Sequence, residues 1–191
     1  NQPYIGLWNC SALGHALSSL VSEESQGEIL QTYEPIFQKT LAELYQKKLG
    51  LIKLNRDDAQ LIQGLLDIME SEKLDYKNTF KNISQAITNE ETPELNTHIA
   101  KSWIKSYQAR HKIEPSSIDE KVSLINENNP KFILRNYMAQ EAIEAAENLN
   151  LSMLETLIHV ITHPYDELEQ FEYFASRSPD WAKDLEISCS S

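Results

Sequence analysis

Two histidines have the spacing that most directly suggests chemistry: His159 and His163 stand four positions apart in an expected helix. Side chains four apart share one helix face, so such a pair can bind Zn²⁺. The glutamate of an H-E-x-x-H zinc motif is missing, because position 160 is Val. A zinc site, and with it a metal-dependent hydrolase, is therefore the minor interpretation, and we expect no metal ligands in this chain.

The two cysteines, Cys10 and Cys189, are the candidate reactive thiols. Cys10 falls on the apolar stripe of a helix expected over residues 6–21, which favours a small buried hydrophobic side chain. His15, in the same helix, is expected to be partly buried and has no second ligand three or four residues away. Cys189 is flanked by serines near the last residue, so we expect it to be exposed and able to react; the alternative is an inert thiol. Two cysteines exclude a disulfide-stapled scaffold and indicate a reducing compartment.

Composition excludes several classes of function. The 191 residues carry a net charge of −12, which disfavours non-specific binding to nucleic acid or to anionic membranes. The five glycines form neither a G-x-G-x-x-G nor a G-x-x-x-x-G-K phosphate loop. No apolar run approaches the roughly 20 residues of a membrane helix, and the start shows no signal-peptide pattern. The chain opens on Asn1-Gln2-Pro3 without Met, so we expect a fragment of a longer protein.

The clearest helix signal is the stretch 129–147. Pro130 occupies a favoured first-turn position, and a stripe with three-and-four spacing follows it. Arg135 and Asn136 interrupt the apolar pattern. A guanidinium beside an apolar stripe either pairs with a carboxylate or extends to water, and we favour a structural role for Arg135 over a functional one.

The remaining pattern predicts an all-α chain. Caps and periodicity place further helices over 23–49, interrupted at Pro35 and ended at Gly50, over 56–72 and 118–127, and after caps at Asp75, Thr92 and Ser152. No strand is strongly signalled. We expect one helical domain over residues 1–191, with a mobile loop at 88–92 and a mobile tail at 165–191.

Three separated stretches together resemble the selenoprotein O family, also called the YdiU family. They are N-Q-P-Y-I-G-L-W-N at 1–9; N-P-K-F-I-L-R-N-Y at 129–137, continued by A-I-E-A-A-E at 142–147; and P-Y-D-E at 164–167, followed by P-D-W-A-K at 179–183 and S-C-S-S at 188–191. Their order and approximate spacing fit the C-terminal portion of the family over the whole chain.

The resemblance implies a protein-kinase-like fold that works as a pseudokinase. The family binds ATP in a flipped orientation with Mg²⁺ or Mn²⁺ and transfers AMP to Ser, Thr or Tyr hydroxyls of proteins. Its nucleotide loop, Lys–Glu pair and metal-binding segments lie before the point that matches Asn1. The resemblance therefore implies a helical C-lobe and C-terminal extension, with no catalytic or cofactor-binding residue in this chain.

One functional residue carries over from the family. Its near-terminal redox residue, a selenocysteine in some animal members, matches Cys189. In members with cysteine it can pair with a cysteine of the activation segment, which would lie upstream of Asn1. The C-x-x-U pattern is not reproduced, because position 186 is Glu. Cys10 falls where the family usually has Leu and is not the expected partner.

Two functions remain open. The first is the C-terminal region of a protein adenylyltransferase, with protein substrates and with ATP and Mg²⁺ bound by the longer parent. The second is a non-catalytic helical interaction or scaffold module. Neither function is expected to involve nucleic acid or a membrane. A lobe that is separated from the rest of its protein exposes apolar surface and could self-associate through it. The expected location is the bacterial cytoplasm; eukaryotic members of the family are mitochondrial.

Overall fold

The computed structural model describes residues 2–53, 55–88, 92–182 and 185 of the chain. All regular elements within these residues are helical, which confirms the all-α prediction. The chain divides into two compact units, Asn1–Gln46 and Lys47–Ser191. The expected single-domain organisation and the kinase-like fold stay predictions.

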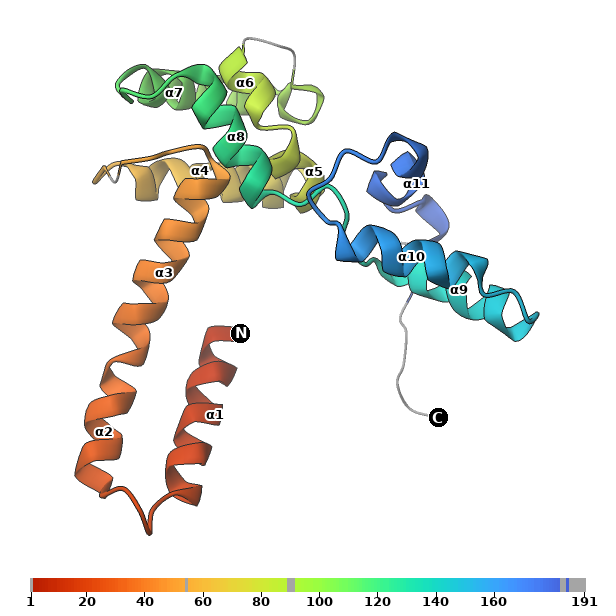
Figure 1. Ribbon diagram of the computed structural model, residues 1–191. Helices are drawn as coiled ribbons and strands as arrows, with labels where there is room; N and C mark the ends of the chain where they lie inside the picture. The colour runs from red at the N-terminus through yellow and green to blue at the C-terminus, as the bar shows by residue number, and fades with distance from the viewer. Residues whose placement is uncertain (1, 54, 89–91, 183–184, 186–191) are drawn as a thin grey trace. The chain divides into compact units, whose positions relative to one another are not determined.

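The first unit is a helical hairpin. α1 (Gln2–Ala16) folds back beside α2 (Glu23–Gln31), and α3 (Tyr33–Lys48) follows α2 after a break at Thr32 (Figure 1). The break confirms that Pro35 would kink or split the predicted helix, because proline is tolerated only in the first turn of α3. Tyr33 Oη donates to the carbonyl of Pro3 at 3.0 Å.

The hairpin of the first unit has no core of its own. None of the residues in α1 or α2 is buried. Cys10 is exposed, so its predicted burial is wrong, and the prediction of a partly buried His15 is wrong for the same reason. The apolar stripe that suggested burial is present and faces α2 and α3, but these helices do not close over it: Cys10 lines a cavity of about 370 Å³ with side chains that include Ile29 and Tyr33.

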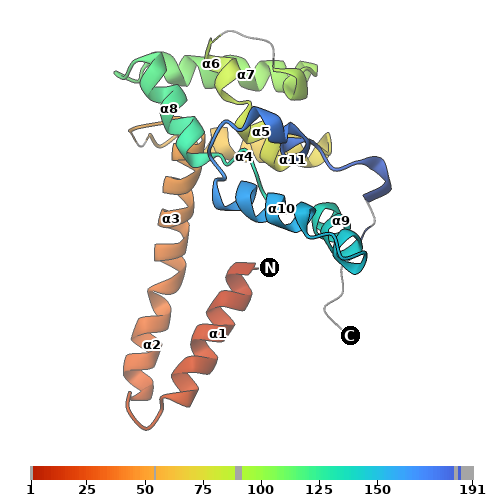
Figure 2. The same ribbon diagram turned by 45° about the vertical axis from the view of Figure 1, so that its right-hand side comes forward.

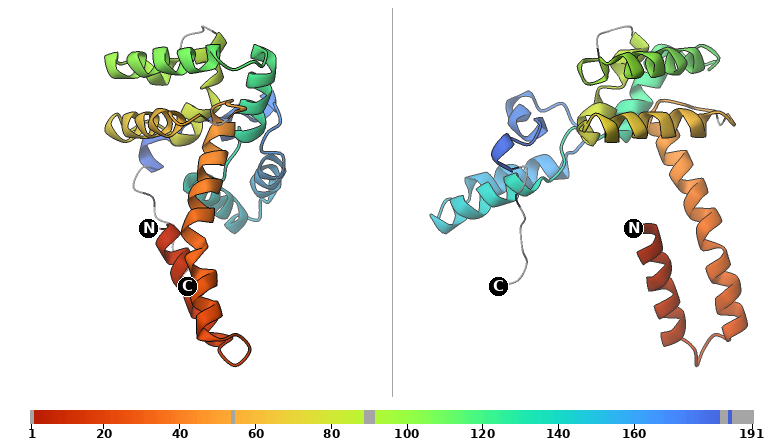
Figure 3. Two further views of the ribbon diagram at one scale, coloured as in Figure 1. Left: turned by 90° about the vertical axis from the view of Figure 1, so that its left-hand side faces the viewer. Right: turned by 180° about the vertical axis from the view of Figure 1, so that it is seen from behind.

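The second unit begins with a layered group of helices: α4 (Asp58–Ser71), α5 (Tyr76–Lys81), α6 (Ser84–Thr88), the 3₁₀ turn η1 (Pro93–Leu95), α7 (His98–Lys112) and α8 (Ile118–Asn128). α4 packs on α7, and α6 packs on both α7 and α8 (Figure 3). Their shared core contains the fully buried side chains Leu49, Leu65, Phe80, Ile83, Tyr107 and Ile125. Gly50 ends α3 at φ +67°, as its stop signal predicts, and a Cβ there would lie 2.9 Å from the Ile125 side chain.

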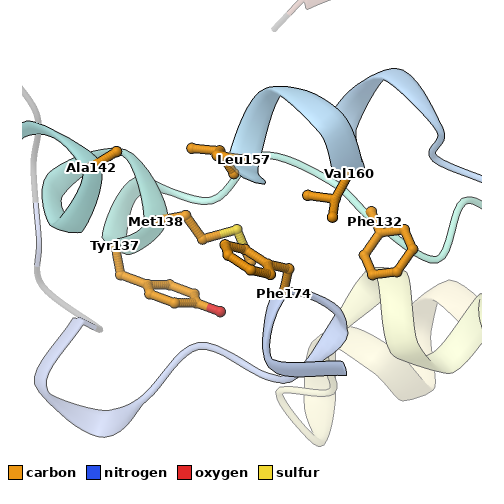
Figure 4. Close-up of a cluster of buried hydrophobic side chains, with 7 residues drawn as sticks. All are labelled: Phe132, Tyr137, Met138, Ala142, Leu157, Val160 and Phe174. Carbon is orange, nitrogen blue, oxygen red and sulfur yellow. The ribbon is translucent and has the colours of Figure 1, made fainter. Parts of the chain in front are cut away.

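The second unit continues with α9 (Asn136–Glu147) and α10 (Ser152–Thr162), an antiparallel pair, and then with η2 (Glu169–Phe171), α11 (Glu172–Ala175) and η3 (Asp180–Ala182) (Figure 2). Figure 4 shows side chains from these elements and from the preceding segment pointing toward one another. We call this cluster the α9–α10 core: Phe132, Tyr137, Met138, Ala142, Leu157, Val160 and Phe174.

Several predicted helix starts are displaced; the helix expected from residue 6, for example, begins at Gln2. The helix expected from Pro130 begins only at Asn136, because residues 130–135 are non-helical and the N–H groups of Lys131 and Phe132 donate to the carbonyl of Pro164. Pro93 starts only the short turn η1, and Thr97 caps α7 instead of Thr92. Ser152 is the first residue of α10 rather than its cap.

Candidate functional site

The first polar cluster of the second unit centres on Arg135. Its two terminal nitrogens donate to both carboxylate oxygens of Asp75, at 2.8 and 3.0 Å, and both side chains are largely buried. Asp75 also caps α5 by accepting the N–H of Asn78 at 2.9 Å, as the sequence predicts. Burial works to raise the pKa of Asp75, but the hydrogen bonds from Arg135 and Asn78 outweigh it and hold the pKa below its ordinary value. Arg135 is thus a paired charge that joins α9 to the start of α5.

Lys77 in α5 is a buried lysine beside this pair. Its Nζ donates to the carbonyl of Lys131 at 3.0 Å and to the carbonyl of Ala175 at 2.5 Å. Burial, and then the positive charge of Arg135, lower the pKa of Lys77 to about 8. The side chain therefore ties three segments together: α5, the non-helical run before α9, and the end of α11.

Lys131 completes this cluster from the other side. It forms ion pairs with Glu167 at 2.7 Å and with Glu172, and Lys81 also contacts Glu167 at 2.9 Å. Burial works to lower the pKa of Lys131, and its hydrogen bonds to the two carboxylates raise it overall. We call this set the Arg135 network: Asp75, Lys77, Lys81, Lys131, Arg135, Glu167 and Glu172. Because its charged groups bind one another or backbone carbonyls, it holds segments together and offers no free nucleophile or base.

A second cluster lies between α4 and α7 and includes Glu114, which follows α7. Arg110 contacts Asp58 at 2.6 Å, Glu114 at 2.8 Å and the carbonyl of Lys53 at 2.6 Å. Its hydrogen bond to Asp58 raises the pKa of Arg110 despite partial burial. A cavity of about 480 Å³ adjoins this cluster and is lined by Asn55, Asp57, Asp58, Gln60, Leu61, Trp103, Ser106, Ala109, Arg110 and Ile113. Asp58 and Arg110 neutralise each other at its wall, so neither is a free acid or base there.

His111 in α7 is a buried imidazole. It is 5% exposed, and its Nε2 lies 3.0 Å from the carbonyl of Leu49, which also accepts the hydroxyl of Tyr107 at 2.8 Å. Burial lowers the pKa of His111 to about 4, although the bond to Leu49 opposes the shift. The ring is neutral at pH 7 and positions the backbone after α3, a structural role.

The structure does not bring Asn136 and the histidine pair, which the sequence singled out, together in one site. Cys189 lies outside the described residues. Asn136 donates to the carbonyl of Leu185 at 3.2 Å and so holds the last described residue at the start of α9. His163 Nδ1 lies 2.8 Å from the carbonyl of His159, inside its own helix turn. Within the part of the chain that the structure describes, no group of three or more His, Cys, Asp or Glu could hold a metal ion.

Sequence reasoning missed Lys77, Arg110 and Lys131 as the centres of these clusters. Each has a partner far away along the chain: Glu167 lies 36 residues from Lys131, Asp58 lies 52 residues from Arg110, and Ala175 lies 98 residues from Lys77. No local pattern encodes such distances. Lys77 follows the predicted cap at Asp75, but a lysine in a short helix is ordinarily a surface residue, so nothing in the sequence indicated its burial.

Comparison with known proteins decides the family. A family model described as "Protein adenylyltransferase SelO" matches residues 1–162. The chain belongs to the SelO family. Similar SelO-family proteins include the protein nucleotidyltransferase YdiU of Vibrio atlanticus, 38% identical over 194 residues, and that of Aliivibrio salmonicida, 37% identical over 194 residues. The YdiU protein of Erwinia tasmaniensis is 38% identical over 196 residues.

The match covers all of this chain but only part of each relative. The alignments span 100% of the chain and 40% of the Vibrio and Aliivibrio proteins, and 41% of the Erwinia protein. The described helices contain no segment long and apolar enough to cross a membrane. The sequence has neither a G-x-G-x-x-G nor a G-x-x-x-x-G-K phosphate loop.

Proposed function

We propose that this chain is the C-terminal helical region of a longer protein adenylyltransferase. The parent would have a pseudokinase fold, bind ATP and Mg²⁺ or Mn²⁺ outside these residues, and transfer AMP to Ser, Thr or Tyr hydroxyls of protein substrates. In that reaction the hydroxyl oxygen bonds to the α-phosphorus of ATP, pyrophosphate leaves, and the hydroxyl proton passes to a base. The observation that carries the proposal is the match to the SelO family over residues 1–162.

The geometry of the second unit supports a positioning role for these residues. The Arg135 network joins α5, α9 and α11 through paired charges, and such networks hold elements in one arrangement. A helical region of this kind supports a site formed by other residues. The chain itself is therefore proposed to have no nucleotidyl transfer activity.

The test is the intact mass of the longer protein after incubation with ATP and Mg²⁺, with the 191-residue chain in parallel. Addition of the mass of AMP to the longer protein alone supports the proposal. No addition to a correctly folded longer protein would favour a non-catalytic module, and addition to the 191-residue chain would mean that these residues contain an active site.

Cys189 is proposed as a redox residue whose partner lies outside this chain. The resemblance of the stretch S-C-S-S at 188–191 to the family's near-terminal redox position supports this proposal, and the thiolate is the reactive form of a cysteine. The proposed location is a reducing bacterial cytoplasm, in keeping with only two cysteines. Non-reducing mass analysis of the oxidised longer protein, with Cys189→Ser as the control, tests the disulfide.

A second candidate function is a helical protein-interaction module. It is favoured by the exposed apolar side chains of the first unit, which include Tyr4, Trp8, Leu13, Leu20, Ile29 and Ile36. Apolar surface of this kind marks an interface. Binding of a protein partner by the longer protein after complete removal of ATP, with no AMP transfer under any condition, would favour this candidate.

A further inference from the structure

The outer face of α10 carries an apolar stripe that the described residues of the second unit leave partly exposed. Leu151, directly before the helix, and Leu154 and Ile158 within it follow a spacing of three and four, which puts them on one face. Their exposed fractions are 52%, 38% and 49%. Leu157 and Val160 point instead into the α9–α10 core (Figure 4).

This stripe is not needed to complete the local fold. The α9–α10 core already buries side chains from both helices, from α11 and from the segment before α9. The first unit differs, because α1 and α2 bury no residue at all. The apolar surface of the first unit could therefore become part of a core if another element covered it. The α10 stripe has no such role, because the α9–α10 core is already complete without it.

The connection between α9 and α10 exposes a further apolar side chain, that of Leu149, from an unfavourable backbone conformation. Leu149 is 94% exposed and has φ +60°, a left-handed conformation that glycine adopts far more easily. Its N–H donates to the carbonyl of Ala146, and the N–H of Asn150 donates to the carbonyl of Ala145, so the strained geometry is fixed by the helix end. An exposed leucine at a position suited to glycine points to a use for the side chain.

The charged side chains in the stretch of sequence that contains the stripe are all acidic, apart from histidines. Residues 136–176 contain eight carboxylate side chains and no Lys or Arg. Lys131 and Lys81 together neutralise Glu167 and Glu172. Glu147 at the end of α9 and Glu155 between Leu154 and Ile158 are exposed, and neither has an ion-pair partner among the described residues.

We propose that Leu149, Leu151, Leu154 and Ile158, with Glu147 and Glu155, form a docking surface for a cationic amphipathic segment of a partner protein. Leu or Ile side chains of the partner would contact the stripe, and its Lys or Arg side chains would meet the two glutamates. A second copy of this face would bring like charges together, and anionic lipid or nucleic acid would be repelled for the same reason. The proposal stands independently of AMP transfer.

The test measures binding of a labelled peptide by fluorescence anisotropy, to the longer parent protein and to the 191-residue chain in parallel. The probe is an amphipathic Leu/Lys peptide of roughly 15 residues, about four helical turns. A peptide with Glu in place of Lys, and another with Ser in place of Leu, are the control probes. We expect the Leu/Lys peptide to bind at least about tenfold more tightly than either control, with affinity falling as salt rises.

Surface variants locate the binding. Leu151→Gln with Ile158→Gln should weaken binding at least about tenfold, and Glu147→Lys with Glu155→Lys should weaken it and reduce its salt dependence. The matched controls are Ile99→Gln and Glu70→Lys, which change exposed residues of α7 and α4 and should leave binding unchanged. Circular dichroism confirms that each variant is folded.

Four outcomes would overturn the proposal. They are no binding of the Leu/Lys peptide by the unaltered chain, equal loss in the control variants, unchanged binding in the α10 variants, and a change in oligomeric state of the α10 variants in place of a change in peptide affinity. None of these bears on AMP transfer, so failure here is distinct from failure of the proposed function.

Discussion

Individual residues of this chain are fixed by partners far away in the sequence. Arg135 is the clearest case, because its guanidinium and the carboxylate of Asp75 are 60 residues apart and largely buried. The expectation that Arg135 plays a structural role is supported by this pairing. A charge that is removed from a buried pair leaves its partner uncompensated, which costs more than the pair contributes.

Substitution of Arg135 tests this role. Arg135→Met should lower the free energy of unfolding by about 3 kcal/mol, since Asp75 keeps its charge without its guanidinium partner. Urea unfolding followed by circular dichroism measures the change. The control is Lys39→Met, which removes an exposed pair with Glu43 at 3.9 Å and should cost no more than about 0.5 kcal/mol. Equal effects of both substitutions would contradict a structural role for Arg135.

His111 predicts a pH dependence of stability. Its pKa is about 4 in the folded chain, against 6.5 for an unperturbed imidazole. Between these values the unfolded chain binds more protons, so stability falls as pH drops from 6.5 to 4, by roughly 3 kcal/mol in total from this group. NMR titration of the His111 ring, with urea unfolding at each pH, measures both quantities. A His111 titration midpoint near 6.5 would contradict the assignment.

At the scale of elements, the sequence predicted helix boundaries best where the contacts that set them lie within a few residues of one another. The helix expected over 118–127 is observed over Ile118–Asn128, because the Ser117–Glu120 capping box lies within one turn. The helix expected from Pro130 failed, because the N–H groups of Lys131 and Phe132 bind a carbonyl more than thirty residues away. The clusters around Arg135 and Arg110 depend on contacts of this second kind, so sequence periodicity could not reveal them.

The end of α9 offers a test of backbone strain. Leu149→Gly should raise the free energy of unfolding by about 0.5–1 kcal/mol, because glycine adopts φ +60° without a Cβ clash. Asn148→Gly is the matched control, since Asn148 has φ −90° and glycine there should destabilise the chain. Thermal unfolding measures both variants. A loss of stability in Leu149→Gly would show that the leucine side chain contributes to folding after all.

At the scale of the whole molecule, the two units differ in how their helices are stabilised. α7 buries Ala100, Trp103, Tyr107 and His111, whereas α1 and α2 bury no residue. Isolated helices of this length are marginal in water, and most helical stability in proteins comes from a packed face. The two units should therefore open at different free energies.

Hydrogen exchange measures this difference directly. In the 191-residue chain, amides of α1 and α2 should exchange at least about tenfold faster than amides of α7, as read by mass spectrometry of peptides from each helix. A second result is expected in the longer protein. Amides of α1 and α2 should exchange more slowly there than in the 191-residue chain, whereas amides of α7 should be unchanged, because a covering element would bury Trp8 and its neighbours. Equal protection of all three helices in the 191-residue chain would mean that the first unit is stable without a cover, and its apolar face would then favour a partner protein over the rest of the parent.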